Sequence, residues 1–394
     1  MLGPMDHMAR GSVVAQETPD MDGGDAALVL PDYGGACIAS VVPALLRRDE
    51  LAAAGTAPAW LPEVALGARQ VVLLVLDGLG YEQLVANTSH APTLRAMSGG
   101  PITSVAPTTT AAALTSISTG RAPAAHGVLG YRLCARGSVL NVLRWTVDGK
   151  DARASFPPAS LQPLEPFLGR RPPVVSKAEF AGTGFTDAHL PGARLIGWRM
   201  PSAICVEVAG LLRAGEPFVY AYYDGIDKIA HDRGLGEHFA AELRATDRLV
   251  LDLLDALPPG AALVVTADHG QVEVGSDPIV LAGEVTEDVV LLSGEGRFRW
   301  LHAAPGATKR VAERCREHYS DVAWVRTREE IVADGWFGGP LRPELEERLG
   351  DVALVARERV AFFDPSDTGE LRLVARHGSL TSAEMLVPLL AAAP

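Results

Sequence analysis

The chain has 394 residues, of which 48% are apolar and 21% charged, so it can bury a large core and does not resemble a disordered chain. This length favours one large α/β domain with a smaller insertion. The formal net charge of -13 disfavours the basic groove that a duplex-binding protein needs.

Residues 1–30 are expected to form a disordered or artificial leader, because no apolar segment follows a basic start as in a secretory signal. No stretch reaches the roughly 18 uninterrupted apolar residues that a membrane helix needs. The 4 cysteines are far apart and form no CxxC pair, which favours reduced structural thiols. We therefore expect a cytoplasmic protein, and the sequence does not fix its oligomeric state.

Three continuous apolar runs predict buried parallel strands, and each ends in acidic residues. They are "VVLLVL" over 71–76, which ends at Asp77, the run from Phe218, which leads to Asp224 and Asp227, and the run from Ala262, which ends at Asp268 and His269. Helical patterns lie between them, notably from Glu237, so we predict a doubly wound, mostly parallel α/β sheet. In such sheets ligands bind beyond the carboxyl ends of the strands, where these acids gather.

The segment "SVAPTTTAAALTSISTG" predicts a helix from Thr110 to Thr119 that ends at Gly120. The amide groups and dipole of a helix N-terminus favour an anion, so the Thr110 hydroxyl would face a phosphoryl group there. Taken alone, a threonine at this place is more often a helix cap than a nucleophile.

Three short segments carry residues that ligate metals. In "DGIDKIAHDRG" the spacing of Asp227 and His231 puts both on one face of a turn or helix, although such pairs are often surface pairs. In "TADHGQ" the carboxylate of Asp268, next to His269, follows a buried strand, where it would be costly without a partner. His377 precedes an expected capping box from Thr381 to Glu384.

Together these residues offer enough oxygen and nitrogen ligands for two divalent ions. Zinc suits imidazole and carboxylate ligands best, and other divalent metals are possible. The set consists of Asp77, Thr110, Asp227, His231, Asp268, His269 and His377.

The sequence resembles the type I phosphodiesterase/nucleotide pyrophosphatase family of the alkaline phosphatase superfamily. The resemblance rests on "VLDGLG", "APTTTAAALTSISTG", "AHGVLGYR", "DGIDKIAH", "TADHGQ" and "RHGS" in this order, and it spans residues from about Pro31 onward. It implies an alkaline-phosphatase-like fold and a small phosphoester as substrate.

The resemblance also implies roles for single residues. Thr110 would be the nucleophile and form a phospho-threonine intermediate. The implied ligands are Asp227, His231 and His377 for one zinc, and Asp77, Asp268 and His269 for the other. Where eukaryotic relatives carry Phe-Pro-Asn-His after the threonine, this chain has "AAAL", which weakens the case for nucleotides. Asn141 is a weak candidate for the phosphate-contacting asparagine, and an ordinary strand or loop residue is the alternative.

Charge counting favours a diester or pyrophosphate over a monoester. Two divalent ions carry four positive charges and three aspartates three negative ones, and the net charge of one suits a singly charged phosphoryl group. The alternatives are a phosphomonoesterase, a phosphonate hydrolase on the same metal core, and a binding protein without turnover. A sulfatase is disfavoured, because its Cys/Ser-x-Pro-x-Arg motif is missing around Thr110.

The remaining predictions concern the surroundings of the site. Residues 31–282 and 366–394 are expected to form the catalytic domain, and 283–365 a small α/β cap-like insertion. Phe298, Trp300 and Trp336 of the insertion are candidates for one wall of a substrate pocket, with a core position as the alternative.

Asp224 is expected to hydrogen-bond a ligand histidine. His126 is expected to be a residue at a helix exit. Four further histidines have no ligand spacing and are expected to be surface or packing residues: His189, His238, His302 and His318.

Overall fold

The computed structural model describes residues 27–275, 277–367 and 372–394. Residues 1–26 of the expected leader lie outside this part. The rest of that prediction needs a correction, because Leu28 and Val29 pack against the hydrophobic core. The Val29 N–H also donates to the Leu380 carbonyl at 2.9 Å. This part of the predicted leader therefore belongs to the folded chain.

A seven-stranded mixed sheet forms the centre of the molecule, in the order β2-β17-β10-β1-β9-β7-β8. β17 runs antiparallel to both of its neighbours, and the remaining pairs are parallel. β1, β9 and β10 are buried along almost their whole length, which explains their continuous apolar sequences. The strands are β1 (Gln70–Leu76), β2 (Ser98–Thr103), β7 (Pro173–Lys177), β8 (Arg194–Trp198), β9 (Phe218–Tyr223), β10 (Ala261–Thr266) and β17 (Leu386–Ala392).

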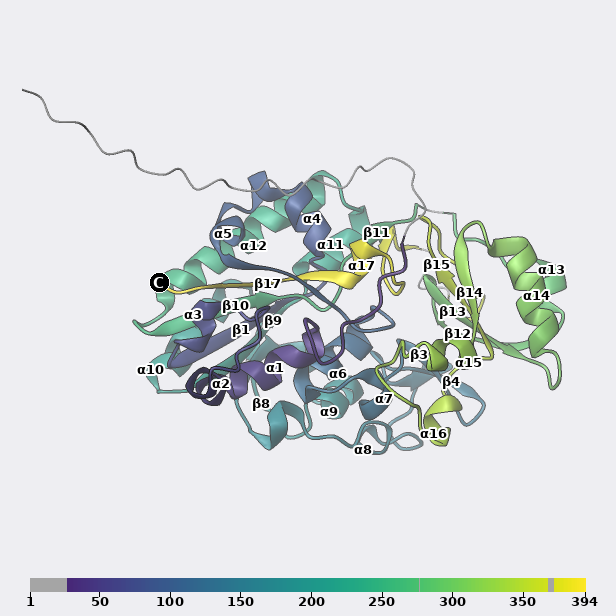
Figure 1. Cartoon of the computed structure of the whole chain (residues 1–394), viewed down its shortest axis with the longest axis horizontal. Coiled ribbons are helices and arrows are strands. Elements are labelled where there is room, and N and C mark those ends of the chain that lie inside the picture. The colour runs from purple at the N-terminus through teal and green to yellow at the C-terminus, as the bar shows by residue number, and fades with distance from the viewer. Residues whose placement is uncertain (1–26, 276, 368–371) are drawn as a thin grey trace, which may run out of the picture.

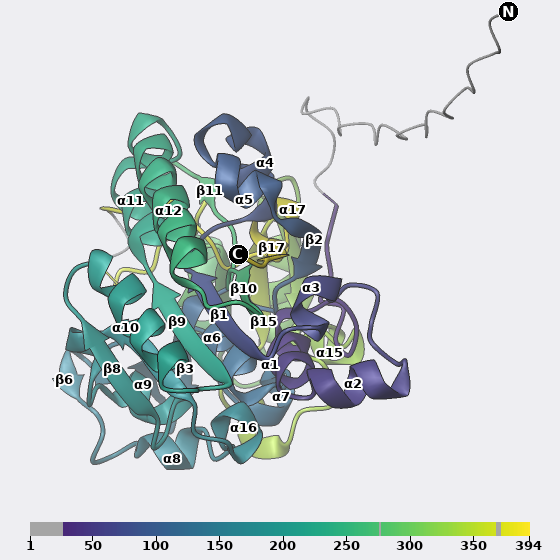
Figure 2. The same ribbon diagram turned by 90° about the vertical axis from the view of Figure 1, so that its left-hand side faces the viewer.

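Helices cover both faces of this sheet, as the doubly wound prediction requires (Figures 1 and 2). One face carries α4 (Tyr81–Ala86), α5 (Pro92–Ala96), α10 (Ser202–Arg213), α11 (Gly225–Arg233) and α12 (Glu237–Ala256). The other carries α1 (Ile38–Leu46), α6 (Thr110–Thr119), α7 (Pro123–His126) and α9 (Gly184–His189). Shorter helices are α2 (Arg48–Ala54), α3 (Glu63–Leu66), α8 (Pro158–Leu161) and α17 (Ser382–Met385).

A second sheet lies at one end of the molecule, on the right in Figure 1, within the predicted insertion. Its four antiparallel strands have the order β12-β13-β15-β14. They are β12 (Val289–Glu295), β13 (Phe298–Ala303), β14 (Ala323–Thr327) and β15 (Val352–Ala356). The accompanying helices are α13 (Gly283–Thr286), α14 (Thr308–Tyr319), α15 (Arg328–Ala333) and α16 (Pro343–Glu346).

The aromatic residues of this insertion do not form a pocket wall. Phe298, Trp300 and Trp336 are 0%, 2% and 0% exposed and belong to the main hydrophobic core. The prediction that these residues line a substrate pocket was therefore wrong, and the core position that we held as the alternative is correct. Burying three large rings stabilises the junction of the two sheets.

Two small sheets complete the fold. One is a meander of β3 (Arg132–Ala135), β4 (Ser138–Asn141), β5 (Thr146–Val147) and β6 (Lys150–Asp151). The other pairs β11 (Val272–Glu273) with β16 (Ala375–Arg376) and so holds the segment before His377 against the chain that follows β10. Among the helices of the described residues, none is both long and apolar enough to cross a membrane.

Candidate metal centre and nucleophile

The acidic residues predicted to follow three strands do lie at one edge of the central sheet. β1 lies between β9 and β10 and is parallel to both, with Leu76 opposite Tyr223 and Val75 opposite Thr266. Because these pairs are in register, the chain leaves all three strands at the same level. Asp77, Asp227 and Asp268 are thereby brought together, as the sequence predicted.

One group of candidate ligands is fully buried at this edge and consists of Asp77, Asp268 and His269. One ligand atom of each lies within 4.8 Å of the others. The His269 Nε2 is 3.4 Å from Asp77 Oδ1 and 3.5 Å from Asp268 Oδ2. Neither of these two carboxylate oxygens has a hydrogen-bond partner among the described residues. Buried carboxylate oxygens without partners are costly, so a cation fits between these two.

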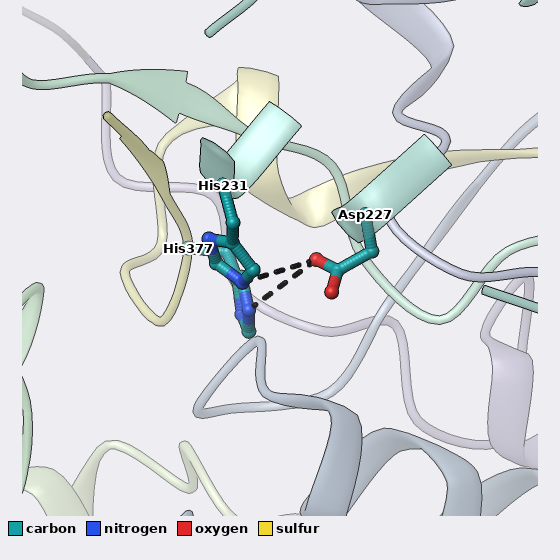
Figure 3. A group of neighbouring side chains, drawn as sticks. All are labelled: Asp227, His231 and His377. Carbon is teal, nitrogen blue, oxygen red and sulfur yellow. Dashed lines mark ion pairs between the residues drawn. The ribbon is translucent and has the colours of Figure 1, made fainter. Parts of the chain in front are cut away.

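A second group is partly exposed and consists of Asp227, His231 and His377. Figure 3 shows both histidine rings next to the Asp227 carboxylate, whose Oδ1 is 3.2 Å from His231 Nε2 and 3.9 Å from His377 Nε2. Asp227 and His231 lie four residues apart on α11, so they share one face of the helix as predicted.

The hydrogen bonds of the two histidines determine which ring nitrogen is available. The Nδ1 of His231 lies 2.7 Å from the Ala375 carbonyl, and the Nδ1 of His377 lies 2.8 Å from the Thr108 carbonyl. Carbonyl oxygens only accept, so both Nδ1 atoms carry hydrogen and donate. In a neutral ring, the Nε2 lone pair then faces the Asp227 carboxylate, and these two electron-rich groups repel each other. A cation between them would be bound by both.

Burial shifts the pKa values of carboxylates and imidazoles in both groups toward the neutral forms, so neither group supplies positive charge of its own. Burial, followed by the charges of Asp268 and Asp227, raises the pKa of Asp77 well above its ordinary value. Burial, followed by the neighbouring His269 and His231, lowers the pKa of His377 well below its ordinary value. The imidazoles of His269 and His377, whose pKa values are both lowered by burial, therefore stay neutral and cannot offset the aspartates. Divalent cations would supply that charge, so the residues present fit two of them.

Thr110 is the first residue of α6, and the predicted helix from Thr110 to Thr119 is confirmed. The preceding Thr109, not Thr110, is the cap, because its side chain accepts a hydrogen bond from the Ala112 N–H at 3.4 Å. The Thr110 hydroxyl is instead 3.2 Å from Nε2 of His269. The alternative interpretation of Thr110 as an ordinary helix cap is thereby removed.

A cavity of about 490 Å³ opens beside Thr110. Asp77 and Asp227, one from each ligand group, also line it. Most of its wall comes from 176–195 and from β9, and it is rich in aromatic and aliphatic side chains: Leu114, Leu143, Phe180, Phe185, Leu190, Leu195, Tyr220 and Tyr222. The sequence interpretation assigned no role to 176–195.

Sequence reasoning missed three residues that hold the acids in place. The Tyr222 hydroxyl donates to Asp77 Oδ2, and the Gln271 side-chain amide donates to Asp227 Oδ1 at 2.6 Å. Gln271 directly follows the "DHG" motif, a signal that was available, whereas no spacing pointed to Tyr222. The third is Lys177, whose ammonium group is 2.8 Å from the Asp224 carboxylate.

The contact of Asp224 corrects one prediction. We expected Asp224 to hydrogen-bond a ligand histidine, but its carboxylate pairs with Lys177 and with Lys228, each at 2.8 Å. The two lysines come from β7 and α11, which flank the end of β9, and their charges outcompete a neutral imidazole as partners.

The expected capping box also has a different role. The Thr381 hydroxyl donates to the Glu384 carboxylate at 2.5 Å instead of capping the helix. That carboxylate forms a buried ion pair with Arg297 at 2.8 Å.

Asn141 is not among the residues that line the cavity beside Thr110. Its side-chain amide donates to the Tyr131 hydroxyl at 2.7 Å, and its oxygen accepts from the Arg144 N–H at 3.0 Å. These contacts agree with the ordinary strand residue that we held as the alternative.

The other histidines are placed as follows. His126 ends α7 before the left-handed Gly127, as predicted, and pairs with the Ser116 hydroxyl at 2.8 Å. His238 and His318 are exposed, and His302 pairs with Ser293 in the second sheet. His189 is buried and lines the cavity.

Comparison with known proteins decides the family. A model of the type I phosphodiesterase/nucleotide pyrophosphatase family matches residues 71–208 and 213–380, which is well over half of the chain. The chain belongs to this family. It is thus a hydrolase of the phosphodiesterase/pyrophosphatase type with a candidate site for the divalent metals that the family uses. No curated protein matches the sequence at a significant level.

Solved structures of low sequence identity share the alkaline-phosphatase-like fold. Murine ectonucleotide pyrophosphatase/phosphodiesterase 5 matches with a TM-score of 0.62 and 16% identity over 82% of this chain and 88% of that one. The human protein of the same name gives 0.60 and 15% over 82% and 88%. Phosphonoacetate hydrolase from Sinorhizobium meliloti 1021, in complex with phosphonoformate, gives 0.59 and 20% over 82% and 90%.

Proposed function

We propose that this protein is a zinc-dependent phosphodiesterase or nucleotide pyrophosphatase that cleaves a small phosphoester through a phospho-threonine at Thr110. The observation that carries the proposal is a pair of buried oxygens next to His269, Asp77 Oδ1 and Asp268 Oδ2, that have no hydrogen-bond partner in the described part of the chain. The same histidine lies 3.2 Å from the Thr110 hydroxyl, so the candidate metal group and the candidate nucleophile adjoin.

Two groups of three residues would hold the ions. Asp77, Asp268 and His269 would hold one, and Asp227, His231 and His377 the other. When bound, the ions would favour the alkoxide of the nucleophile and offset charge on the attacking and leaving oxygens. The mixture of carboxylate and imidazole supports zinc.

Thr110 would attack phosphorus with its side-chain oxygen. The new bond between this oxygen and phosphorus forms as the bond to the leaving alcohol or phosphate breaks, and water then cleaves the phospho-threonine. In the first turn of α6 the Ala112 N–H donates to Thr109, but the N–H groups of Thr110 and Ala111 come before any acceptor within the helix, so they can donate to a phosphoryl oxygen beside Thr110. Each of the two displacements inverts phosphorus, so the configuration is retained overall.

The charge around the cavity supports a diester or pyrophosphate over a monoester. No lysine or arginine of the described residues lines the cavity beside Thr110. Lys177, which lies nearby, is paired with Asp224. A doubly charged monoester would therefore find little further compensation. Murine ectonucleotide pyrophosphatase/phosphodiesterase 5 in an inactive Thr→Ala form was solved with AMP, which supports a nucleotide-like substrate here.

Location and domain layout remain proposals as well. All four cysteines are free, which supports a reducing cytoplasm. We also propose residues 31–282 and 366–394 as the catalytic domain and 283–365 as an insertion.

The decisive experiment is an assay of bis(4-nitrophenyl) phosphate and 4-nitrophenyl phosphate in the presence of zinc. We expect a higher kcat/KM for the diester, and Thr110→Ala to lower diester turnover by at least ~10³-fold with metal content unchanged. Thr119→Ala, the same change at the far end of α6, is the matched control and should stay active. Faster cleavage of the monoester would reassign the protein as a phosphatase, cleavage of phosphonoacetate alone as a phosphonate hydrolase. Near wild-type kcat in Thr110→Ala would refute the covalent route.

A further inference from the structure

The cavity beside Thr110 contains two buried polar groups that the proposed chemistry does not use. His189 is 6% exposed and Tyr220 is 1% exposed, and both line the cavity. Within 27–275, 277–367 and 372–394, neither the His189 Nε2 nor the Tyr220 hydroxyl has a hydrogen-bond partner, and neither atom is sealed from the cavity. Both atoms therefore open onto the cavity, where the polar edge of a ligand can pair with them in place of water.

The hydrogen bond at the other ring nitrogen defines what His189 offers. Its Nδ1 lies 2.7 Å from the Phe185 carbonyl, which can only accept, so Nδ1 carries the hydrogen. Burial lowers the pKa of His189 to about 4, so the ring is neutral near pH 7. Nε2 is then a hydrogen-bond acceptor in an otherwise mostly apolar space.

The walls of the cavity define the shape and charge of its occupant. The His189 ring stacks on Phe185, with centroids 4.1 Å apart and an angle of 15° between the planes. Phe180, Tyr220 and Tyr222 add further aromatic surface, which suits a flat group. The charged residues that line the cavity are all acidic, so an anionic substituent is disfavoured: they are Asp77, Glu179, Asp224 and Asp227.

We propose that His189 is the specificity residue of this cavity, where its Nε2 accepts a hydrogen bond from an uncharged, planar substituent of the substrate. The inference rests on the proposed function, because Thr110 lines the same cavity and would bind the phosphoryl group there. The substrate class is thereby narrowed to phosphodiesters with one flat, neutral group that carries an N–H or O–H donor.

Two substrates that differ by one hydrogen-bond donor test this. The 4-nitrophenyl esters of uridine 5′-phosphate and of N3-methyluridine 5′-phosphate have the same charge, and both release 4-nitrophenolate. For the wild-type protein we expect a KM about 3- to 10-fold lower for the uridine ester with similar kcat, as one neutral hydrogen bond provides. His189→Phe keeps an aromatic ring but has no acceptor, so it should abolish the difference. His189→Gln, which retains an acceptor, should preserve part of it.

A control variant, a replacement variant and a third substrate separate failure of this inference from failure of the proposed function. His318→Phe, the same change at an exposed position outside the cavity, should leave the preference intact. If His189→Phe does not fold, His189→Leu replaces it. Equal KM values in the wild type, or a preference that survives in His189→Phe or His189→Leu, would overturn the inference. Thr110-dependent cleavage of bis(4-nitrophenyl) phosphate would then still support the proposed function, whereas its absence would count against that function itself.

Discussion

The two candidate ligand groups occupy the same edge of the sheet but lie in different environments. Asp77, Asp268 and His269 are fully buried, and two carboxylate oxygens there have no partner among the described residues. Asp227 and its histidines are partly exposed, and Asp227 also accepts from Gln271. Water and an amide can pair with the exposed group in place of a cation, whereas Asp77 Oδ1 and Asp268 Oδ2 in the buried group have no such donor among the described residues. The buried group is therefore the stronger indication of a metal, and the exposed group should exchange its ion more easily.

The largest effect is expected from Asp268→Asn in the buried group. This variant should lower diester kcat/KM by about 10²- to 10³-fold, because it removes a charged ligand beside the nucleophile. In metal-free protein it should raise the free energy of unfolding by about 1–3 kcal/mol, because the amide removes the charge of a carboxylate whose buried Oδ2 has no partner among the described residues, although its Oδ1 accepts from the Gly78 and His269 N–H groups. Assays and thermal melts with and without zinc measure both effects.

Asp247→Asn is the control for the metal-free stability gain. Asp247 is also buried, but each of its carboxylate oxygens has a donor: Oδ2 accepts from the Thr93 N–H at 3.1 Å and Oδ1 from the Leu94 N–H at 2.8 Å. This substitution should therefore not stabilise the protein. Equal effects of the two substitutions on metal-free protein would contradict the expected difference between a carboxylate with both oxygens paired and one whose Oδ2 has no partner among the described residues.

An intermediate effect is expected on the kinetics of metal loss. In an excess of chelator, the wild-type protein should lose metal in a fast and a slow phase, since one group is partly exposed and the other buried. Asp227→Asn should abolish the fast phase and leave the slow one. Stopped-flow detection with a chromogenic chelator measures both. A single phase in the wild type, or a fast phase that persists in Asp227→Asn, would contradict the difference between the groups.

The smallest effects concern the residues that orient the acids. Tyr222→Phe removes the donor to Asp77 and should lower kcat/KM by about 10-fold, a typical cost at a group that orients a metal ligand. Gln271→Ala removes the donor to Asp227, where water can take its place, and should cost less. A larger loss in Gln271→Ala than in Tyr222→Phe would reverse the expected order.

The sequence predicted the parts of this site that depend on local patterns. Apolar runs placed Asp77 and Asp268 at strand ends, the spacing of Asp227 and His231 placed both on one helix face, and the α6 helix followed from its threonine and alanine content. No local spacing linked His377 to Asp227 and His231, and only the family resemblance assigned these three residues to the same ion.

What the sequence could not predict depends on contacts between distant segments. Lys177 reaches Asp224 only because β7 and β9 are neighbours, and that choice of partners depends on the packing of the whole sheet. The cavity wall of 176–195 is formed by ordinary aromatic and aliphatic residues, which do not differ in sequence from core residues. For the same reason Trp300 and Trp336 were candidates for a pocket but are core residues.

The most direct test of the metal centre is the metal content of purified, active protein. Elemental analysis should find close to two zinc ions per chain, one for each of the two ligand groups. Removal of both should abolish diester cleavage, and added zinc should restore it. Full activity with at most one ion per chain would contradict the account.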